Sequence, residues 1–400
     1  MIKAELKNNW IICIGFPKWE GNYAKSSVML MKQLALNYRV VYVDYQHTLK
    51  DLIFGLFFRN TNIPVKRLMG LEDRLTCKDN VYILTPPPVL PINWIRNKTI
   101  YHALLKVNNR IVRSAIRKAI KKLDIHNPAV VNAFNPFFGI YNRGKLNESC
   151  HIYYCYDEIG HAKWMNRHGE RLEAKFAQKV DAVIATSKPL LQKLSARNKH
   201  VYLIENGVDF DLFNRYASPK ETPSIQIVGY TGSIDERLDF EYIEKLASLL
   251  PDVRFKFVGR ITGDGLVKNL EKLNNVEFEP PVDYNRLPAI LSEFDLCLIP
   301  FVKNEFTRNI YPMKINEYLA AGKLTLMTNF AALPEFDDIV FKEDSPEQAA
   351  TRIRNINLLD PNIRGRIDRG IALAKSNSWA SRSAGFIRII EKHSNHQTTA

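Results

Sequence analysis

The stretch PMKINEYLAAGKLTLM runs from Pro312 to Met327. Its proline stands in front of helix-forming residues, which predicts that a helix begins near Met313. Gly322 predicts the end of that helix, because glycine readily adopts the left-handed conformation found there. The apolar run Leu324–Met327 then predicts a strand that is buried on both faces. This order of loop, helix and buried strand is typical of an α/β protein with a parallel sheet.

Short apolar runs alternate with helical patterns along the rest of the chain. The spacing of apolar residues predicts helices over Ser26–Leu36 and Phe240–Leu250, each after the first strand of its half. The expected fold class is α/β, with two Rossmann-like, doubly wound domains that face each other across a cleft. The predicted strands are Trp10–Phe16, Arg39–Val43, Val130–Phe134, His151–Tyr156, Ala182–Thr186, Val201–Ile204, Ile225–Tyr230, Arg254–Val258, Val276–Phe278, Leu296–Ile299 and Leu324–Met327.

The boundary between the two domains is expected near residue 205. Residues 1–205 are assigned to the first domain, residues 206–375 to the second, and residues 376–394 to a terminal helix, with a disordered tail over residues 395–400. The segment Arg215–Ser224 is polar and contains proline, and it lacks any periodicity. Such a composition predicts a linker.

Length and composition exclude several classes of protein. A chain of 400 residues with 46% hydrophobic residues can bury two cores and is not disordered. No stretch reaches the roughly 18 uncharged apolar residues of a membrane-spanning helix. The polar residues Met1–Asn9 lack the regions of a signal peptide, so a cytoplasmic location is expected. The five cysteines are scattered and odd in number, which predicts neither a disulfide framework nor a zinc site.

Positive charge is concentrated in the first half of the chain. Residues 1–200 hold 32 Lys and Arg against 14 Asp and Glu, whereas residues 201–400 hold 24 against 28. Within the first half, Ile92–Lys122 carries nine basic residues and no acid, and Leu52–Phe58 (LIFGLFF) is strongly apolar. Basic and apolar surface together predict docking on an anionic membrane. Nucleic acid is the weaker alternative, because no nucleic-acid-binding module is present, and a solvated helix packed on its own domain is the other alternative.

Several residues near the predicted helix at Met313 suit a phosphorylated ligand. A helix N-terminus offers free N–H groups and a positive dipole end to a phosphate, and Lys314 in the first turn would add a full charge. Glu317 lies one turn further along, where a carboxylate accepts hydrogen bonds from sugar hydroxyls. An exposed helical carboxylate is the alternative interpretation of Glu317. The glycine-containing turn Gly229–Ser233 follows a predicted strand and would let backbone N–H groups approach a pyrophosphate.

The run from Pro281 to Gly322 resembles the donor-binding stretch of GT-B glycosyltransferases, nearest to glycosyltransferase family 4. It has a proline-containing loop, a helix that begins near a glutamate, and the ending EYLAAG. Asn206–Asp209 (NGVD), followed by Phe213, resembles the signature at the junction of the family's two domains. The resemblance implies that the first domain binds the acceptor and the second binds the nucleotide-sugar. It also implies that the terminal helix crosses back to the first domain.

The resemblance assigns roles in donor binding residue by residue. The family's ribose-binding glutamate maps onto Glu317, and Asn309 stands where many members have a glutamate that contacts the donor sugar. Ser233 replaces a frequent arginine, so Arg237 and Lys314 are expected to stabilise the charge of the departing diphosphate. For Arg260 the alternative is a solvated loop residue. The expected donor-binding residues are Gly232, Ser233, Arg260, Asn309, Tyr311, Pro312 and Glu317.

Candidate acceptor residues lie in the first domain. Trp19 and Tyr23, in the loop after the first strand, would stack on a sugar, or else pack on their own domain. Asp157 follows the strand His151–Tyr156 and would activate an acceptor hydroxyl as a general base, or else position the substrates of a retaining enzyme. Capping of a helix N-terminus is the alternative role for Asp157.

The expected function is transfer of a sugar from a nucleotide-sugar to a glycan or polyprenyl-linked saccharide in surface polysaccharide biosynthesis. The alternatives are a nucleotide-sugar epimerase of the same architecture and a non-catalytic scaffold of an assembly complex. No cofactor and no metal are expected. Asp209 and Asp211 are spaced like a metal-binding Asp-x-Asp motif, but the junction signature accounts for them. The protein is expected at the inner face of the membrane, docked through residues 92–122.

Overall fold

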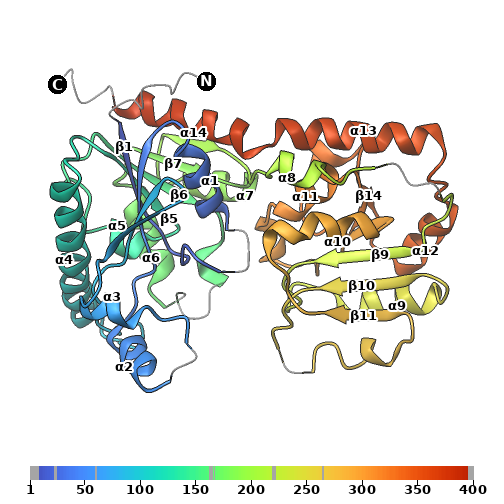
Figure 1. The fold of residues 1–400 in the computed structure, drawn as a ribbon, viewed down its shortest axis with the longest axis horizontal. Helices are drawn as coiled ribbons and strands as arrows, with labels where there is room; N and C mark the ends of the chain where they lie inside the picture. The colour runs from blue at the N-terminus through green and yellow to red at the C-terminus, as the bar shows by residue number, and fades with distance from the viewer. Residues whose placement is uncertain are drawn as a thin grey trace. The chain divides into compact units, whose positions relative to one another are not determined.

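The computed structural model describes residues 9–21, 25–58, 61–161, 165, 167–218, 222–263 and 265–394. These residues form two compact units (Figure 1). The first unit comprises the described residues up to Glu205 and those from Ser383 onward, and the second comprises Asn206–Arg382. Tyr23 and residues 395–400 lie outside the described residues.

The first unit is built on an eight-stranded sheet in the order β3-β4-β2-β1-β5-β6-β7-β8. Its strands pair in parallel except for β3, which is antiparallel to β4. The strands are β1 Trp10–Ile14, β2 Arg39–Val43, β3 Leu75–Lys78, β4 Val81–Leu84, β5 Ala129–Ala133, β6 Cys150–Cys155, β7 Ala182–Ala185 and β8 Val201–Leu203. The helices are α1 Ser26–Leu34, α2 Leu49–Phe57, α3 Val65–Met69, α4 Lys98–Lys122, α5 Pro136–Gly139, η1 Ile159–His161, α6 Gly169–Ala177 and α7 Lys188–Ser195.

The second unit is built on a six-stranded parallel sheet in the order β11-β10-β9-β12-β13-β14. Its strands are β9 Ile227–Thr231, β10 Arg254–Val258, β11 Val276–Glu279, β12 Leu296–Ile299, β13 Leu324–Met327 and β14 Phe341–Lys342. Its helices are α8 Phe210–Asn214, α9 Phe240–Leu249, η2 Leu270–Lys272, η3 Tyr284–Arg286, α10 Leu287–Glu293, η4 Thr307–Asn309, α11 Met313–Ala320, η5 Pro334–Phe336, α12 Pro346–Asn355 and α13 Pro361–Ser376.

One further helix, α14 (Trp379–Ser394), contains the point at which the second unit ends and the first resumes. At its start, the Trp379 N–H donates to the Val208 carbonyl at 2.9 Å, within the second unit. Near its end, the Tyr38 hydroxyl donates to Glu391 at 3.2 Å, within the first unit. The residues of α14 from Ser383 onward therefore complete the first unit.

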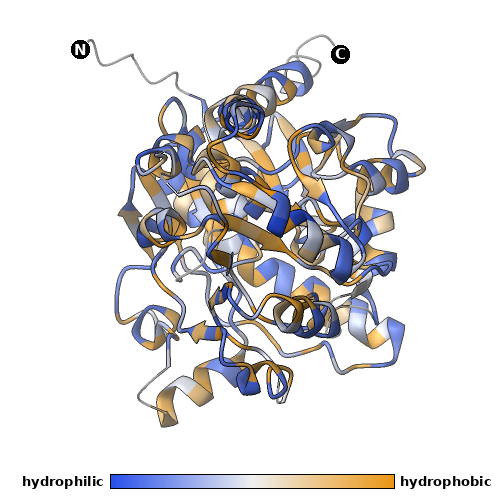
Figure 2. Cartoon of the chain, turned by 90° about the vertical axis from the view of Figure 1, so that its right-hand side faces the viewer, coloured by the Kyte–Doolittle hydropathy of each residue, from blue (hydrophilic) through white to orange (hydrophobic). Residues whose placement is uncertain are grey.

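The predicted strands are confirmed, with their ends shifted by no more than two residues. They are recognisable because parallel strands are buried on both faces, as the burial of every residue of β1, β5 and β13 shows. Apolar strands appear orange in Figure 2. The α/β fold with two Rossmann-like units is therefore confirmed.

The sequence analysis missed strands β3, β4 and β14. Strand β14 has two residues, and β3 and β4 have four each, which is too short for a periodic signal. The two-residue turn between β3 and β4, Asp79-Asn80, has φ values of 53° and 61°. Positive φ at both central positions is typical of a tight hairpin turn. The dipeptide Asp-Asn was the feature of the sequence from which this turn could have been predicted.

The linker predicted over residues 215–224 is wrong, because those residues lie inside the second unit. The helix before them, α8, is anchored to that unit. Phe213 is fully buried in its core, and the Asn214 side chain donates to the Ala320 carbonyl at 2.9 Å. The described part of this segment, residues 215–218 and 222–224, lies in the chain between α8 and β9.

Candidate functional site

Helix α11 is fastened to the carboxyl end of β9, at the edge of the second sheet where ligands of parallel α/β proteins bind. The Tyr318 hydroxyl accepts a hydrogen bond from the Thr231 N–H at 3.0 Å, and both residues are buried. Pro312 precedes the first helical residue as the N-cap, as predicted, and its side chain makes no capping hydrogen bond. This arrangement holds the start of α11 beside the loop after β9.

Lys314 lies directly against Gly232, the residue that follows β9. A β-carbon built on Gly232 would come within 2.2 Å of Cε and 2.4 Å of Nζ of Lys314, and Gly232 has φ of +135°. Any side chain at this position would therefore displace the lysine. The Lys314 amine also lies 5.5 Å from the centroid of the buried Tyr230 ring. Gly232 and Lys314 are 82 positions apart in the sequence, and the structure brings them together.

Lys314 and Glu317 share one face of α11 without forming an ion pair with each other. Neither side chain makes an ion pair or hydrogen bond with any residue in the part of the chain that the structure describes. Glu317 is only 6% exposed, whereas Lys314 is half-buried. An unpartnered carboxylate at this depth is costly, which points to a ligand that supplies the missing partner.

Burial shifts the ionisation of both groups. Desolvation lowers the pKa of Lys314 to about 8, and Arg237 acts in the same direction, while Glu317 and Asp235 oppose the shift. Desolvation also raises the pKa of Glu317 to about 7, against the attraction of Lys314. Perturbed pKa values of this kind are typical of functional sites. An anion beside Lys314 would favour its charged form, and a hydroxyl donor beside Glu317 would favour the carboxylate.

Arg237 lies close enough to Lys314 for its charge to lower the lysine's pKa. Its guanidinium forms a two-point ion pair with Asp235, at 2.8 Å from Nε and 2.6 Å from the terminal nitrogen. It also lies 5.9 Å from the centroid of the Phe301 ring. The structure therefore places both predicted charge-stabilising residues at one site, with Arg237 held in position by Asp235.

The loops after β9 and β10 are packed together by glycine. A β-carbon on Gly259 would lie 1.8 Å from the carbonyl oxygen of Gly232, so only glycine permits this approach. The Ser233 carbonyl accepts a hydrogen bond from the Tyr230 hydroxyl at 2.9 Å. Arg260 follows Gly259 and its side chain is exposed. Its role in donor binding stays a prediction.

A buried amide network supports the start of α11, and the sequence analysis missed it. The fully buried Asn316 donates to the Tyr311 hydroxyl at 3.2 Å and accepts from the Asn377 side chain at 2.9 Å. The Asn206 side chain donates to the Tyr311 carbonyl at 2.9 Å. Tyr311 is therefore held as part of this network and is itself buried. In the sequence, the network is indicated only by an asparagine among the apolar positions of a helix. That residue alone does not show which distant residues it contacts.

Asn309 and Asp209 have local partners. The Asn309 side chain donates to the Glu305 carbonyl at 2.8 Å, within the turn that contains η4. The Asp209 carboxylate caps α8 by accepting from the Leu212 N–H at 3.2 Å. Among the described residues there is no group of three or more His, Cys, Asp or Glu side chains able to hold a metal.

The candidate acceptor residues lie in the first unit. Asp157 follows β6, and one of its carboxylate oxygens accepts from the Glu158 N–H at 2.8 Å. Trp19 is 5% exposed, and its ring packs edge-on against Tyr42 with centroids 5.1 Å apart. Its burial favours the alternative that this aromatic residue packs on its own domain. Tyr23 lies outside the described residues.

Two family models match separate parts of the chain. Residues 78–212 match the model described as Glycosyltransferase Family 4, and residues 225–357 match Glycosyl transferases group 1. The chain belongs to the glycosyltransferases of the family 4 type. The group 1 match contains Gly232, Lys314 and Glu317, and the family 4 match contains Asp157.

A curated relative is consistent with this family. Over 168 residues the glycosyltransferase is 30% identical to TuaH of Bacillus subtilis (strain 168), a protein named for teichuronic acid biosynthesis. The match covers 39% of this chain and 42% of TuaH, so it spans less than half of that relative.

The same fold is found in solved structures of low sequence identity. A glycosyltransferase from Rickettsia africae has a TM-score of 0.64 at 15% identity, with 97% of this chain and 99% of that chain covered. Anabaena HepE, solved in complex with UDP and glucose, has a TM-score of 0.66 at 13% identity, with 96% and 100% covered. A trehalose-phosphate synthase from Burkholderia xenovorans has a TM-score of 0.69 at 10% identity, with 96% and 100% covered. These likenesses confirm the GT-B fold of the glycosyltransferase.

Proposed function

We propose that this protein transfers a sugar from a nucleotide-sugar to a glycan or lipid-linked saccharide acceptor in surface polysaccharide biosynthesis. The observation that carries the proposal is the unpartnered pair Lys314 and Glu317 on α11, beside the glycine at position 232. A nucleotide diphosphate supplies what both side chains lack. It brings an anion for the lysine and ribose hydroxyls for the carboxylate.

In this proposal the second unit stabilises the departing nucleoside diphosphate. Negative charge develops on the diphosphate as the glycosidic bond breaks, and Lys314 and Arg237 stabilise it electrostatically. Gly232 leaves room for the lysine, and the N-terminus of α11, which the Pro312 side chain does not cap, presents its positive dipole end to a phosphate. HepE, with UDP and glucose in its structure, supports a nucleotide-sugar as the donor class.

The acceptor side of the proposal rests on the first unit. We assign Asp157 the role of a base or a positioning residue, because it follows β6 at the end of the sheet where ligands of parallel α/β proteins bind. The name of TuaH, which refers to teichuronic acid biosynthesis, supports a cell-surface polysaccharide as the product. No metal ion or organic cofactor takes part in the proposed reaction.

The proposal also places the protein at the inner face of a membrane. No helix among the described residues is both long and apolar enough to span a bilayer. Helix α2 has no buried residue and exposes Ile53, Phe54 and Phe57, and Phe58 directly after it is exposed as well. A capping box between Thr48 and Asp51 caps its N-terminus. It is the lowest helix in Figure 1, and its apolar residues are orange in Figure 2. An exposed apolar helix near the basic helix α4 supports docking on anionic lipid.

A panel of nucleotide-sugars tests the proposed function. The full chain is incubated with each donor, with and without a membrane lipid extract that carries saccharide acceptors, and free nucleoside diphosphate and labelled glycolipid are measured. We expect one donor to yield both products, and we expect the Glu317→Gln variant to yield far less of both when the donor is below saturation. Interconversion of donor epimers without labelled glycolipid would indicate an epimerase. Neither turnover nor binding of any donor would indicate a scaffold, and either outcome would overturn the proposal.

A further inference from the structure

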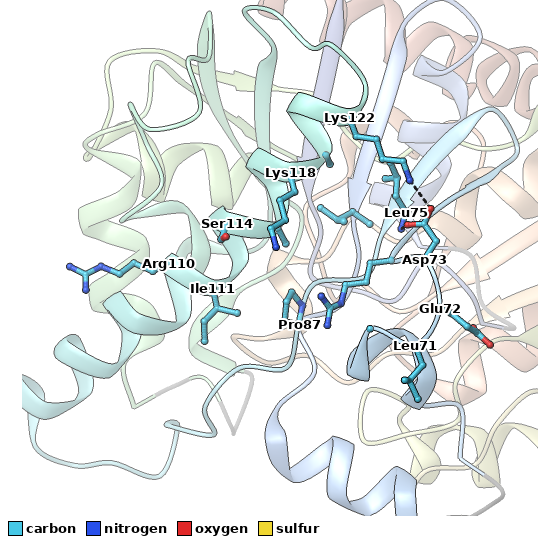
Figure 3. Close-up of a pocket in the computed structure, with 15 residues that line it drawn as sticks. Leu71, Glu72, Asp73, Leu75, Pro87, Arg110, Ile111, Ser114, Lys118 and Lys122 are labelled. Carbon is cyan, nitrogen blue, oxygen red and sulfur yellow. Dashed lines mark hydrogen bonds and ion pairs between the residues drawn. The ribbon is translucent and has the colours of Figure 1, made fainter.

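A groove of about 830 Å³ lies in the first unit, between α4 and the segment that joins α3 to β3 (Figure 3). The opposite wall contains Leu71, Asp73 and Leu75, and α4 contributes Ile111, Ser114, Lys118 and Lys122. The volume falls within the range of roughly 300–1,000 Å³ that is typical of ligand sites. No residue assigned to sugar transfer lines this groove.

The floor of the groove is apolar. Leu84, Ala115 and Ala119 are buried beneath it, and Ile111 and Leu75 are half-buried along its sides. Leu71, at one rim, is 71% exposed. Apolar surface of this kind favours a hydrocarbon chain and does not suit the backbone of a nucleic acid.

The cations at the groove are of two kinds. Lys122 is neutralised by Asp73 at 2.6 Å, and Arg74 donates to the Arg67 and Leu68 carbonyls at 3.0 Å each. Arg110 and Lys118, by contrast, have no ion pair or hydrogen bond to any residue the structure describes. They therefore remain available for an anion.

The uncompensated charge continues beyond the groove. A second hollow of about 360 Å³ on the same helix face shares Arg110, Ser114 and Lys118 with the groove and adds Lys121. Lys121 also lacks a partner among the described residues. Ile92–Lys122 contains no acid, so the carboxylates at the groove come from the opposite wall. Asp73 pairs with Lys122, and Glu72 pairs with Lys66 and Arg67, so neither neutralises Arg110 or Lys118.

The exposed apolar helix α2 lies close to this groove through α3. A β-carbon on Gly55 of α2 would come within 2.7 Å of the Val65 side chain at the start of α3, so the two helices are in contact. Helix α3 ends at Gly70, which lines the groove. A bilayer reached by α2 would therefore also be near the mouth of the groove.

We propose that this groove binds one anionic phospholipid molecule, with a hydrocarbon chain along the apolar floor and the phosphate beside Lys118 and Arg110. This inference rests on the membrane docking in the proposed function. It deepens that proposal, because one saturable lipid site replaces a general attraction between the basic surface and anionic lipids. We infer an anionic lipid because the unpaired cations of the groove would attract its negative charge. We infer a lipid and not a free phosphate because the floor of the groove is apolar.

Two variants separate the groove from general surface charge. Ser114→Trp places a large side chain in the groove at an exposed position and leaves every charge in place. Arg110→Glu with Lys118→Glu reverses two exposed cations. Arg197→Glu with Lys199→Glu makes the same change of charge at exposed positions before β8, the strand at the other edge of the sheet from β3, and is the matched control.

The probe is decyl phosphate below its critical micelle concentration, titrated calorimetrically into the full chain, with inorganic phosphate and decyl maltoside as separate arms. We expect saturable one-to-one binding of decyl phosphate and at least tenfold weaker binding of the other two. Ser114→Trp should weaken binding at least tenfold. The reversal at positions 110 and 118 should weaken it at least roughly thirtyfold, because loss of two lipid-facing charges costs about 1 kcal/mol each and the new carboxylates also repel the phosphate. The matched control should bind as the unaltered protein does.

Sedimentation with phosphatidylcholine vesicles, with and without phosphatidylglycerol, provides a second readout. The variants should rank in the same order by the fraction of protein that sediments with the vesicles that contain phosphatidylglycerol. Equal affinity for inorganic phosphate, tighter binding of a single-stranded oligonucleotide, or undiminished binding by Ser114→Trp would each overturn the proposal. Should Ser114→Trp fail to fold, as judged by its circular dichroism, the charge-reversal pair and its control decide the question. None of these assays uses a nucleotide-sugar, so their outcome is independent of whether sugar transfer is detected.

Discussion

The amine of Lys314 occupies the space where a side chain on Gly232 would lie, with only 2.4 Å between Nζ and a β-carbon at that position. The lysine belongs to α11 and the glycine follows β9, so the contact joins a helix start to a strand end. Because Lys314 finds no ion-pair partner among the described residues, its position is set by packing and not by a counter-charge. We therefore expect the glycine to be essential to the placement of the lysine.

Gly232→Ala should displace Lys314 and weaken nucleoside diphosphate binding at least tenfold, as measured by calorimetry. The substitution also strains the backbone, because φ is +135° at this position. Gly144→Ala is the control, since Gly144 has φ of +71° and no atom near its would-be β-carbon. Gly144→Ala should lose on the order of 1–2 kcal/mol of unfolding free energy and Gly232→Ala roughly 1–3 kcal/mol, but only Gly232→Ala should lose affinity. Equal affinity in the two variants would refute the packing argument.

The affinity for a nucleoside diphosphate should fall as the pH rises through about 8. Lys314 has a lowered pKa of about 8 in the free protein, so it loses its charge there, and the neutral amine attracts the diphosphate less. Binding near pH 8 should be accompanied by proton uptake, which appears in calorimetry as a dependence of the heat on the buffer. Lys314→Met should remove the alkaline decline and the proton uptake together. A decline that persists in Lys314→Met would assign it to another group.

Glu317→Gln should weaken nucleoside diphosphate binding by roughly ten- to a hundredfold. Charge-assisted hydrogen bonds contribute about 1.5–3 kcal/mol, and the amide replaces the carboxylate without changing the shape of the side chain. The exposed Glu271→Gln serves as the control in the same unit. Equal affinity in Glu317→Gln and the unaltered protein, by titration calorimetry, would place the ribose elsewhere.

The same Glu317→Gln variant should be more stable than the unaltered protein when no ligand is bound. Burial raises the pKa of Glu317 from 4.5 to about 7, so the folded state disfavours the charged form. The resulting cost is absent below pH 4.5, grows as the pH rises to about 7, and is constant above that value. It amounts to about 3 kcal/mol at most. Urea unfolding at pH 4.5 and pH 8 should show the difference between the two proteins only at the higher pH.

Ile53→Ser with Phe57→Ser should lower sedimentation with vesicles that contain phosphatidylglycerol by tenfold or more. Phe57 is 78% exposed and Ile53 is 55% exposed, so the change removes little packing within the protein. Burial of such side chains in lipid contributes roughly 1.5–3 kcal/mol each when complete. Leu36→Ser, at a residue that is 61% exposed after α1, is the matched control. Unchanged sedimentation of the α2 variant would exclude this helix from the membrane contact.

Much of the candidate site could be predicted from the sequence because its signals are local. Pro312 and Gly322 bracket a helix through their backbone preferences, and the helix is α11 with only small shifts. Glu317 and Lys314 follow at fixed positions within that helix. The spacing between a helix start and its next turn is a property of the backbone and does not depend on the rest of the fold.

The partners of these residues could not be predicted in the same way. The asparagines at positions 206, 316 and 377 form one buried network although they are far apart in the sequence. Trp19 looked available to a sugar because loop aromatics often are, but its ring packs against Tyr42. Such contacts depend on which strands are neighbours in the sheet, and the order of strands is not a local property.

The sequence by itself determined the α/β alternation, the strand positions, and the residues that could hold a nucleotide diphosphate, because burial and backbone preference leave local patterns. Only the tertiary structure decided that Gly232 makes room for Lys314 and that Glu317 is buried without a partner. It also decided that the basic face of α4 borders an apolar groove near the exposed helix α2. These are relations between distant segments, and they arise only when a parallel sheet brings the segments to one edge or one face.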